Sequence, residues 1–266
     1  MIRTPRWLVF QRWERLLFAH WRADPDRLAR VLPHGVQPDL YGGTAWVAVV
    51  AFVMEATRAP FGPRWRGIAP IPELNVRTYV RVGGVPGVWF LSLDATSPLF
   101  VSMGRALYGL RYALAKMTTA TDGERVHYVS AGAGRAFAAS YAPTGAVRPA
   151  QEGTLERFLV ERYRLFSERR GRLLTATVEH EPWPLQPAQA RIHLNTMAPP
   201  GVALEGLPLV NYSHSVSARI SAPESLDGAS VSQLAPTTRP HLRRRDAPRA
   251  RRSAEQRPVR VPADAS

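Results

Sequence analysis

Four polar side chains alternate along one apolar stretch of the sequence: Glu73, Asn75, Arg77 and Tyr79. Side chains on a β-strand point alternately to opposite faces, so on a strand these four share one face. A carboxylate, an amide, a guanidinium and a phenol on one face could line a pocket for a small polar molecule. The alternative is a solvated strand face held together by cross-strand ion pairs, and the pattern alone favours that alternative.

Two arginines could hold the carboxylate of a ligand. Arg77 lies on the face just described, and Arg105 follows in a segment with a helical pattern. A guanidinium group can bind a carboxylate through two parallel hydrogen bonds, which suits arginine to such a ligand. Each arginine could equally form an internal ion pair with Glu73 or Asp94, and the sequence leaves the two interpretations open.

Metal and cofactor chemistry has little support in the sequence. The chain has no cysteine, which excludes disulfides and thiolate metal sites. Its seven histidines show neither HxH nor HxxxH spacing, so we predict no metal site. A Gly-x-Ser-x-Gly elbow and a Walker loop are also absent, and no cofactor is predicted. His20 is expected first as a hydrogen-bonded interior histidine and second as a general base.

A predicted hairpin and a predicted helix would position these candidates. Residues 74–82 and 88–93 are rich in β-branched and aromatic side chains, and they flank a glycine- and proline-containing turn at 83–87. This is the pattern of a β-hairpin. A helix is predicted next, because four apolar side chains fall on one helical face, namely Leu99, Met103, Ala106 and Leu107.

The same signals predict the other elements of the N-terminal half. Asp24 and Pro25 are typical of a helix start, and that helix is expected to end at 33–35. The apolar run 46–54 predicts a buried strand, and residues 58–72 predict a loop long enough to be a lid or a pocket rim. The first twenty residues are interpreted as a short helix or irregular arm that leads into a strand at 16–21.

The C-terminal half contains the longest predicted helix, at 154–170, where five apolar side chains form one stripe and Gly171 could end the helix. Many strands, few helices and short connections predict an α+β fold. We expect a large antiparallel, barrel-like sheet with a few flanking helices. The further strands are predicted at 125–129, 135–141, 173–180, 190–194 and 211–220.

Length and composition suggest one folded domain followed by a tail. The 266 residues are 45% hydrophobic, which is ample for a substantial core. We place the domain at 1–220 and interpret 221–266, rich in Arg, Pro and Ala, as a disordered tail. No apolar run reaches eighteen residues and the start lacks a signal-peptide pattern, so we expect no membrane partner and a cytoplasmic location.

The net charge of +14 raises the expectation of an anionic partner. The arginines of the tail could neutralise phosphates, but the tail has no aromatic residue to stack on bases and no recognisable module. Nucleic acid is therefore not the expected partner, and a solvated tail is the favoured interpretation. Edge strands and the Trp-rich N-terminal arm are compatible with a homo-oligomer.

Several motifs of rare residues, in order from about Trp13 to Ile220, resemble the YqjF-like family of bacterial proteins. That family is similar to acetoacetate decarboxylases, whose fold is a barrel-like cone around a buried pocket. The resemblance therefore implies that fold for this chain. The motifs are Phe18-Ala19-His20-Trp21, Leu32-Pro33-His34-Gly35, Pro72-Glu73-Leu74-Asn75-Val76-Arg77, Gly87-Val88-Trp89-Phe90, Glu161-Arg162-Tyr163 and His180-Glu181-Pro182-Trp183-Pro184.

The decarboxylase resemblance also implies a departure in the site. Glu73 matches a pocket carboxylate of those enzymes, and the motif that begins at Gly104 and Arg105 resembles the one leading into their pair of catalytic lysines. Those two lysines fall on Tyr112 and Ala113 here. Tyrosine cannot form the iminium by which such a lysine drains electrons as carbon dioxide leaves. A second pocket carboxylate expected on 46–54 is missing as well.

Lys116 is the only lysine of the chain. If 111–117 is a strand, Lys116 shares a face with Tyr112 and lies about 13 Å further along it. It could supply a reactive amine to a shifted pocket, but a solvated lysine at a strand end is the favoured interpretation.

The sequence thus predicts a pocket for a small molecule that bears a carboxylate or carbonyl group. If the protein is an enzyme, Glu73 or Tyr112 moves a proton and an arginine holds the substrate. The alternatives are a non-catalytic binding protein and weak nucleic-acid binding through the tail, so whether the protein is an enzyme stays open. The predicted lining is Glu73, Asn75, Arg77, Tyr79, Arg105 and Tyr112.

Overall fold

The computed structural model describes residues 5–58 and 70–226. Strands dominate, and three short helices lie around them. The elements are β1 (Trp7–Ala23), α1 (Pro25–Val31), β2 (Gln37–Pro38), β3 (Ala45–Arg58), β4 (Ile71–Val82), β5 (Val85–Ala95), α2 (Pro98–Tyr108), β6 (Tyr112–Leu114), β7 (Lys116–Asp122), β8 (Arg125–Gly132), β9 (Arg135–Pro143), α3 (Leu155–Val160), β10 (Arg164–Arg169), β11 (Arg172–His180), β12 (Leu185–Asn195), β13 (Glu205–Ser221) and β14 (Glu224–Ser225).

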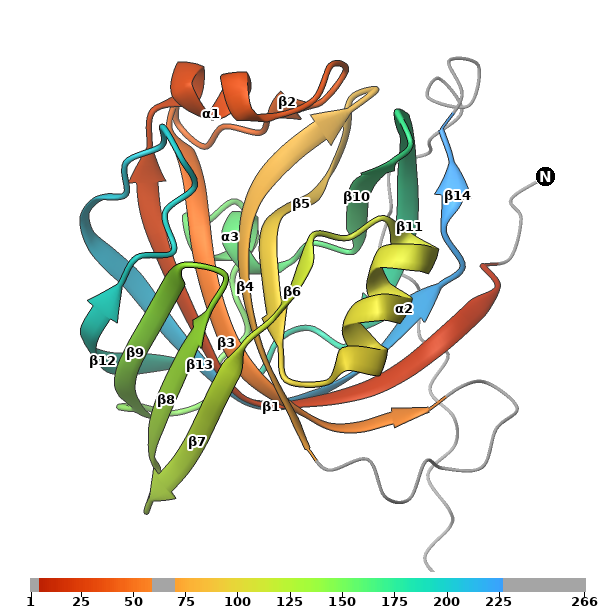
Figure 1. Ribbon diagram of the computed structural model, residues 1–266. Coiled ribbons are helices and arrows are strands. Elements are labelled where there is room, and N and C mark those ends of the chain that lie inside the picture. Colours follow the sequence, from red (N-terminus) through yellow and green to blue (C-terminus); the bar gives the residue numbers. More distant parts are fainter. Residues whose placement is uncertain (1–4, 59–69, 227–266) are drawn as a thin grey trace, which may run out of the picture.

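The strands close into a ring, which confirms the predicted barrel-like sheet. Neighbouring strands follow the order β11-β10-β5-β4-β3-β1-β13, and a pairing between β11 and β13 joins the two ends. Most pairs are antiparallel, as predicted, but β5 pairs in parallel with both β10 and β6, so the sheet is mixed. Figure 1 shows the curved strands around a common interior, with α2 on one side and β7, β8 and β9 on the other.

Two hydrophobic cores lie on the two faces of the ring. Along β3, Ala48, Val50 and Phe52 belong to the core inside the ring, whereas Val47 and Val49 belong to a second core outside it. The outer core is completed by an arm of strands, β12-β9-β8-β7, which folds back over the ring. Burial on both faces explains why the predicted strand 46–54 reads as an unbroken apolar run.

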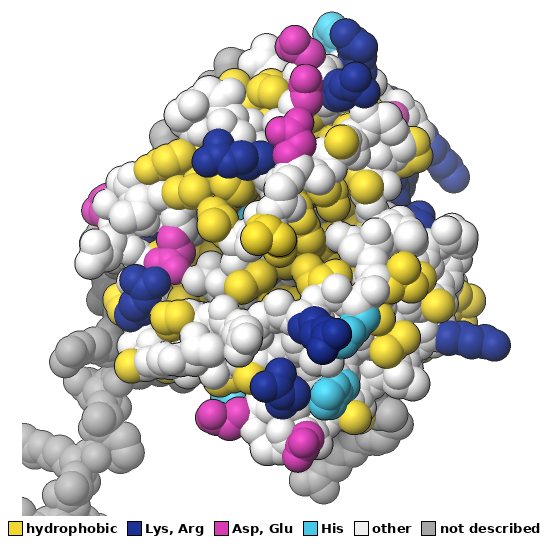
Figure 2. Space-filling view, turned by 90° about the vertical axis from the view of Figure 1, so that its left-hand side faces the viewer, with side chains coloured by type: hydrophobic (Ala, Val, Ile, Leu, Met, Phe, Trp, Pro, Cys, Tyr) yellow, Lys and Arg dark blue, Asp and Glu magenta, His cyan; other side chains and the backbone are white. Residues whose placement is uncertain are grey.

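The outer face of the molecule, turned away from α2, is shown in Figure 2. Hydrophobic side chains gather in the middle of this face, and charged and histidine side chains lie around them. No helix among the described residues is long and apolar enough to cross a membrane.

The N-terminal interpretation is corrected. Instead of a helix or an irregular arm, β1 is one long strand that pairs with β13 and β3 over almost its whole length. A β-bulge interrupts the pairing, and Arg15 there adopts a left-handed backbone with φ of 56°. Bulges increase local twist and bend a strand, which helps a long strand to follow a closed ring. Pairing on both edges has overridden the irregular local pattern.

The predicted long helix at 154–170 is also wrong. Thr154 caps a helix of only six residues, α3, and the chain then extends into β10 between β5 and β11. Gly171 does not end a helix but forms the tight turn between β10 and β11, where both Arg170 and Gly171 have positive φ. The apolar stripe fitted a helix, but the open edge of β5 requires a strand partner, and tertiary pairing decides the outcome.

The hairpin β4–β5, the helix at Asp24 and the helix α2 agree with the prediction. Ser97 caps α2, and Gly109 ends it in the left-handed conformation. Of the loop predicted at 58–72, Ile71 and Pro72 belong to β4 and residues 59–69 lie outside the described residues. The fold continues past the predicted boundary at 220, because Leu226 packs on the outer core, and the predicted tail from 227 onward lies outside the described residues.

Candidate functional site

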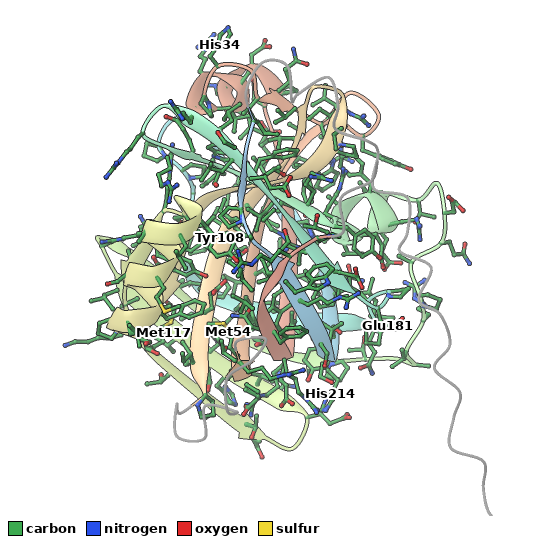
Figure 3. The ribbon with its side chains drawn as sticks, turned by 90° about the vertical axis from the view of Figure 1, so that its right-hand side faces the viewer. His34, Met54, Tyr108, Met117, Glu181 and His214 are labelled. Atoms are coloured by element: carbon green, nitrogen blue, oxygen red, sulfur yellow. The ribbon has the colours of Figure 1, made fainter. Side chains whose placement is uncertain are left out.

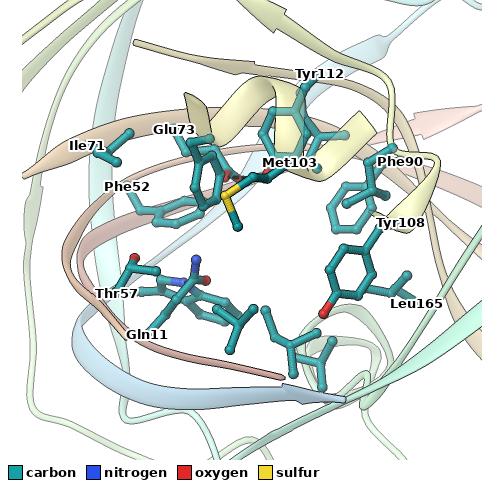
Figure 4. Close-up of a pocket in the computed structure, with 18 of the residues that line it drawn as sticks. Gln11, Phe52, Thr57, Ile71, Glu73, Phe90, Met103, Tyr108, Tyr112 and Leu165 are labelled. Atoms are coloured by element: carbon teal, nitrogen blue, oxygen red, sulfur yellow. Dashed lines mark hydrogen bonds between the residues drawn. The ribbon is translucent and has the colours of Figure 1, made fainter. Parts of the chain in front are cut away.

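A pocket opens between the interior of the ring and α2. Its volume is about 190 Å³, more than ten times the space that a single water molecule needs. Figure 4 shows side chains from several strands and from α2 arranged around an open centre. The lining is mostly apolar, with polar groups that come from several strands, from α2 and from the segment after α3: Gln11, Thr57, Arg58, Glu73, Arg77, Ser97, Tyr108, Tyr112, Arg162 and His180.

Glu73 and Tyr112 form the buried polar pair of this pocket. The Tyr112 hydroxyl donates to Oε2 of Glu73 at 2.7 Å, and the Asn75 amide donates to Oε1 at 3.3 Å. Burial raises the pKa of Glu73 to about 7, although the hydrogen bonds from Tyr112 and Asn75 oppose this effect. Burial also raises the pKa of Tyr112 well above its ordinary value, and the neighbouring Glu73 adds to this. Glu73 can therefore exchange a proton near neutral pH.

Neighbouring elements hold this pair in place. The parallel pairing of β6 with β5 sets Tyr112 beside Leu93. Gly104 of α2 lies over the Tyr112 ring, where a Cβ atom would come within 2.5 Å of a ring carbon. On the other side of the sheet, the Tyr128 hydroxyl donates to the backbone carbonyl of Glu73 at 2.8 Å. Tyr112 is thus held by α2 on one side of the sheet, and Glu73 is held by Tyr128 on the other side.

Arg77 projects from the same face of β4 as Glu73 and lines the pocket. Its Nε and one terminal nitrogen are buried and make no hydrogen bond of normal geometry within the described residues. The guanidinium group lies over the Phe18 ring at 5.5 Å. The internal ion pair considered for Arg77 and Arg105 is not formed within the described residues, where the salt-bridge partner of Asp94 is Arg135 at 2.7 Å.

The remaining residues of the predicted face are buried, so the expectation of a solvated strand face is wrong. Asn75 is 4% exposed and contacts Glu73 rather than the pocket space. Tyr79 is fully buried behind the pocket, packed against both Arg162 and the Phe158 ring. Burial raises the pKa of its hydroxyl. These two residues support the site from behind without lining it.

His20 lies in the interior, as predicted, but not in the pocket lining, and its ring nitrogens make no hydrogen bond of normal geometry within the described residues. Its ring is between Phe18 and Tyr79, with both ring centroids 6.2 Å away. Burial, helped by the nearby charge of Arg77, lowers its pKa to about 3. His20 is therefore neutral at physiological pH and acts as packing beside the site.

Arg105 and Lys116 lie outside the pocket lining. Arg105 is exposed on α2, and its Nε donates to the backbone carbonyl of Tyr112 at 2.7 Å, so it supports Tyr112 instead of facing a ligand. Lys116 is exposed at the start of β7. The strand expected at 111–117 is divided into β6 and β7, because Ala115 interrupts the pairing, so Lys116 is paired with Ala131 on the arm.

Sequence reasoning missed Arg162 and His180 among the charged or titratable groups of the pocket, and also Arg58 and Tyr108. Arg162 pairs with Asp39 at 2.7 Å and stacks over the Phe158 ring at 4.1 Å. His180 stacks against Trp183, with ring centroids 4.7 Å apart, and its Nδ1 lies 2.7 Å from the Glu181 carbonyl. Burial lowers the pKa of His180. Both stand in motifs noted for their rare residues, but no spacing in the sequence connects them with β4.

Within residues 5–58 and 70–226, no three His, Asp or Glu side chains converge as a metal site would require. The pocket holds one carboxyl group, Glu73, and its other charged groups are arginines, so its chemistry suits an anion better than a cation. The predicted absence of a metal and a cofactor stays a prediction.

Comparison with known proteins identifies relatives in sequence. The family model DUF2071, described as an uncharacterized conserved protein, matches residues 10–217. The chain is 38% identical to the uncharacterized protein YqjF of Bacillus subtilis (strain 168) over 212 residues, which cover 78% of this chain and 88% of YqjF.

Solved structures of low sequence identity share the fold. The enduracididine biosynthesis enzyme MppR, complexed with pyruvate, matches with a TM-score of 0.62 at 15% identity, over 85% of this chain and 92% of that one. The acetoacetate decarboxylase of Legionella pneumophila matches with a TM-score of 0.58 at 16% identity, over 85% and 92% of the two chains. An acetoacetate decarboxylase-like enzyme from Sphingomonas wittichii RW1 gives 0.60 at 17%, over 83% and 93%.

Proposed function

We propose, from the premise that this chain belongs to the DUF2071 family and has an acetoacetate decarboxylase-like fold, that its pocket binds a small carboxylate that also carries a carbonyl group. In this proposal Arg77 holds the carboxylate, and Glu73 exchanges a proton with the bound molecule. The observation that carries the proposal is the buried Glu73–Tyr112 pair in one cavity with an arginine that lacks a counter-ion among the described residues.

The charge of Arg77 supports the carboxylate. Two nitrogens of its half-buried guanidinium group are buried without a hydrogen bond of normal geometry among the described residues. Such unpaired groups are costly, and a ligand carboxylate would supply both the counter-charge and the acceptors. Arg162 lines the same pocket but already has Asp39 as its partner. Arg58 also lines it but is exposed, so water can solvate its charge, and its guanidinium group lies over the Phe10 ring at 4.4 Å. Arg77 is therefore the group that a ligand anion would satisfy.

The pKa of Glu73 supports the proton transfer. A carboxyl group whose pKa is about 7 is present in both protonation states at neutral pH, which suits a general acid or base. A carbonyl group acidifies the C–H bond beside it, so a bound oxo acid could lose that proton to Glu73 and regain it. Tyr112 would orient the carboxyl group through its hydrogen bond.

The related folds support this ligand class, because MppR has been solved in complex with pyruvate, a 2-oxo acid. The chemistry would differ from that of a lysine enzyme. The resemblance to decarboxylases aligns their lysines with Tyr112 and Ala113, and the only lysine of this chain is exposed on β7. We therefore propose acid–base chemistry without an iminium intermediate, and a cytoplasmic protein.

The alternative is that the same pocket binds its ligand without turning it over. The substitution of Tyr112 for a reactive lysine favours this alternative as much as it favours acid–base chemistry. Both interpretations require the anion site at Arg77, and they differ only in whether the proton on the ligand exchanges.

The test combines binding with proton exchange for pyruvate, 2-oxobutyrate and acetoacetate. Binding is followed by calorimetry, and exchange of the C–H protons in D2O by NMR. We expect Arg77→Met to weaken binding at least tenfold, the effect of about 1.4 kcal/mol, since a charged hydrogen bond contributes about 1.5–3 kcal/mol. Arg125→Met, at an exposed arginine of β8, is the matched control and should bind as the wild type does.

Glu73→Gln separates the two interpretations. Loss of exchange with binding retained supports catalysis, and binding without exchange even in the wild type supports the binding protein. Absence of binding by all three acids would overturn the proposal. Borohydride treatment with the same acids checks the chemistry: a reduced adduct on Lys116, absent in Lys116→Arg, would restore the iminium route.

A further inference from the structure

The helix α2 presents an apolar face that the ring does not cover. Leu99 is 55% exposed, Met103 40% and Leu107 41%. These side chains are four residues apart and therefore follow one face of the helix. The sequence predicted that these side chains share one face of the helix. Exposed large apolar side chains gathered in this way mark a surface that a binding partner covers.

These three side chains line the pocket that contains Glu73 and Arg77. Figure 4 shows the Met103 side chain pointing into the open centre, opposite Gln11 and Tyr108. In Figure 3, α2, which ends at Tyr108, lies along one side of the ring. Leu8 and Val9 of β1 add apolar side chains to the lining. The cavity therefore runs from buried charged groups to an exposed apolar wall.

The next step rests on the proposed function. We propose that the ligand is an amphipathic oxo acid, whose carboxylate binds at Arg77 and whose apolar chain lies along α2. Leu99 and Leu107 are eight residues apart, which is about 12 Å along a helix. An extended chain of roughly eight to ten carbons would cover this distance, since each C–C bond of about 1.5 Å advances such a chain by about 1.3 Å.

The apolar wall and the anion site belong to one cavity, which favours a single ligand over a second protein on α2. A protein partner on α2 would cover the apolar side chains but would leave Arg77 without a counter-ion. A short acid would satisfy Arg77 but would leave the apolar face in water. An acid with an apolar chain satisfies both.

Chain-length dependence of binding tests this inference. The probes are straight-chain 2-oxo acids of four, six, eight and ten carbons, each used below its critical micelle concentration. Each methylene buried on α2 should tighten binding about fourfold, the ratio that corresponds to about 0.8 kcal/mol per CH2 at 25 °C. Because even the ten-carbon acid does not pass the end of α2, the gain should continue through the whole series.

Two variants test where the apolar chain of the ligand lies. Met103→Gln places a polar amide in the path and should reduce the gain per methylene, most clearly for the eight- and ten-carbon acids. Ser102→Gln is the matched control, because Ser102 is exposed on the same helix and does not line the pocket. It should retain the full chain-length dependence.

The outcomes separate this inference from the proposed function. If the four-carbon acid binds and longer chains bring no gain, the amphipathic ligand is wrong and the proposed function stands. If no acid binds, the proposed function fails. If Met103→Gln changes the sedimentation of the protein and leaves the chain-length dependence intact, α2 is an interface between copies of the chain, and the inference is overturned.

Discussion

Glu73 owes its protonation behaviour to opposing effects that act on one carboxyl group. Burial removes water from the carboxylate and raises its pKa, and the negative charge of Asp94 acts in the same direction. The hydrogen bonds from Tyr112 and Asn75, together with the charge of Arg77, favour the ionised form. The result, a pKa of about 7, depends on each of these neighbours, so changes in any of them should alter the proton exchange.

This shifted pKa should make the unfolding free energy depend on pH. Between about pH 4.5 and 7 the unfolded chain ionises at Glu73 while the folded protein keeps the proton, so stability falls as pH rises. The loss should be on the order of 3 kcal/mol, since one pKa unit corresponds to about 1.4 kcal/mol. Urea unfolding at pH 5, 6, 7 and 8 measures it, and Glu73→Gln should lack this part of the decline.

The comparison with Glu73→Gln isolates one group, because the lowered pKa values of His20 and His180 act in both proteins with the opposite sign. Glu152→Gln, at an exposed position, should keep the wild-type pH dependence. An equal decline in the wild type and Glu73→Gln would show that the pKa of Glu73 is close to its ordinary value in the folded protein.

The sequence predicted part of this site. Strand alternation placed Glu73, Asn75, Arg77 and Tyr79 on one face, and the structure confirms that they face the inside of the ring. Alternation alone could not separate the two that line the pocket from the two behind it. Arg162 and His180 come from distant segments, so only the closed ring, a tertiary feature, reveals that they share the cavity.

At the scale of elements, the helix α2 is predicted well and β10 is not. The apolar spacing indicates one helix, Ser97 and Gly109 cap it in the structure, and no described strand pairs with its backbone. The segment 154–170 also has helical spacing, but Arg164–Arg169 fills the gap between β5 and β11. The local sequence pattern therefore predicts an element correctly where its backbone hydrogen bonds lie within the element. It fails where a distant strand supplies the hydrogen-bonding partner.

The packing of α2 on Tyr112 leads to a prediction about Gly104. Gly104→Ala should raise helix propensity by about 1 kcal/mol, yet its Cβ would come within 2.5 Å of the Tyr112 ring. We expect a net destabilisation of about 1–3 kcal/mol, typical of overpacking, and weaker ligand binding as Tyr112 leaves Glu73. Thermal unfolding and calorimetry measure the two effects.

Ser102→Ala on the same helix is the control and should be neutral or slightly stabilising. Tyr112→Leu in the Gly104→Ala background should recover stability without recovering ligand affinity. A single Gly104→Ala variant that is more stable than the wild type and binds normally would contradict the close fit.

At the scale of the whole molecule, the ring and the arm share one sheet but enclose two separate cores. The ligand pocket belongs to the inner core, whereas Leu226 and the arm belong to the outer one. The last described residues therefore help to cover the outer core, and the Leu226 backbone N–H donates to the Leu173 carbonyl at 2.8 Å. The folded domain thus extends at least to Leu226, past the predicted boundary at residue 220.

Removal of residues 227–266 should leave the folded domain intact. The segment contributes nine arginines and four acidic residues, so the shortened chain keeps most of its net positive charge. We expect the same unfolding midpoint as the full chain and the same affinity for 2-oxo acids. Any retention on single- or double-stranded DNA should be weak in the full chain and decline steeply with salt.

A shorter chain that ends at residue 220 is the informative comparison, because it also loses Leu226 and should unfold more readily. Tight, salt-resistant DNA binding by the full chain that disappears on removal of 227–266 would contradict the interpretation of a solvated segment. It would make nucleic acid the main partner.

The hairpin of β10 and β11 closes the ring through two short strand pairings. It pairs with β5 only at Leu165–Val88 and Phe166–Trp89, and with β13 only from Val178–Ile220 to His180–Ala218. Gly87 permits the pairing of β10 with β5, since a Cβ atom at this position would come within 2.6 Å of the Phe166 ring. Short strand pairings open at lower free energy than the long pairings of β1.

Both short pairings contribute residues to the pocket lining, namely Val88, Leu165, Val178 and Ile220. Brief opening of this hairpin would therefore also widen the pocket. The rate at which a bulky ligand enters would then depend on how often the β10–β11 hairpin opens. A bound ligand would slow amide hydrogen exchange first in this hairpin.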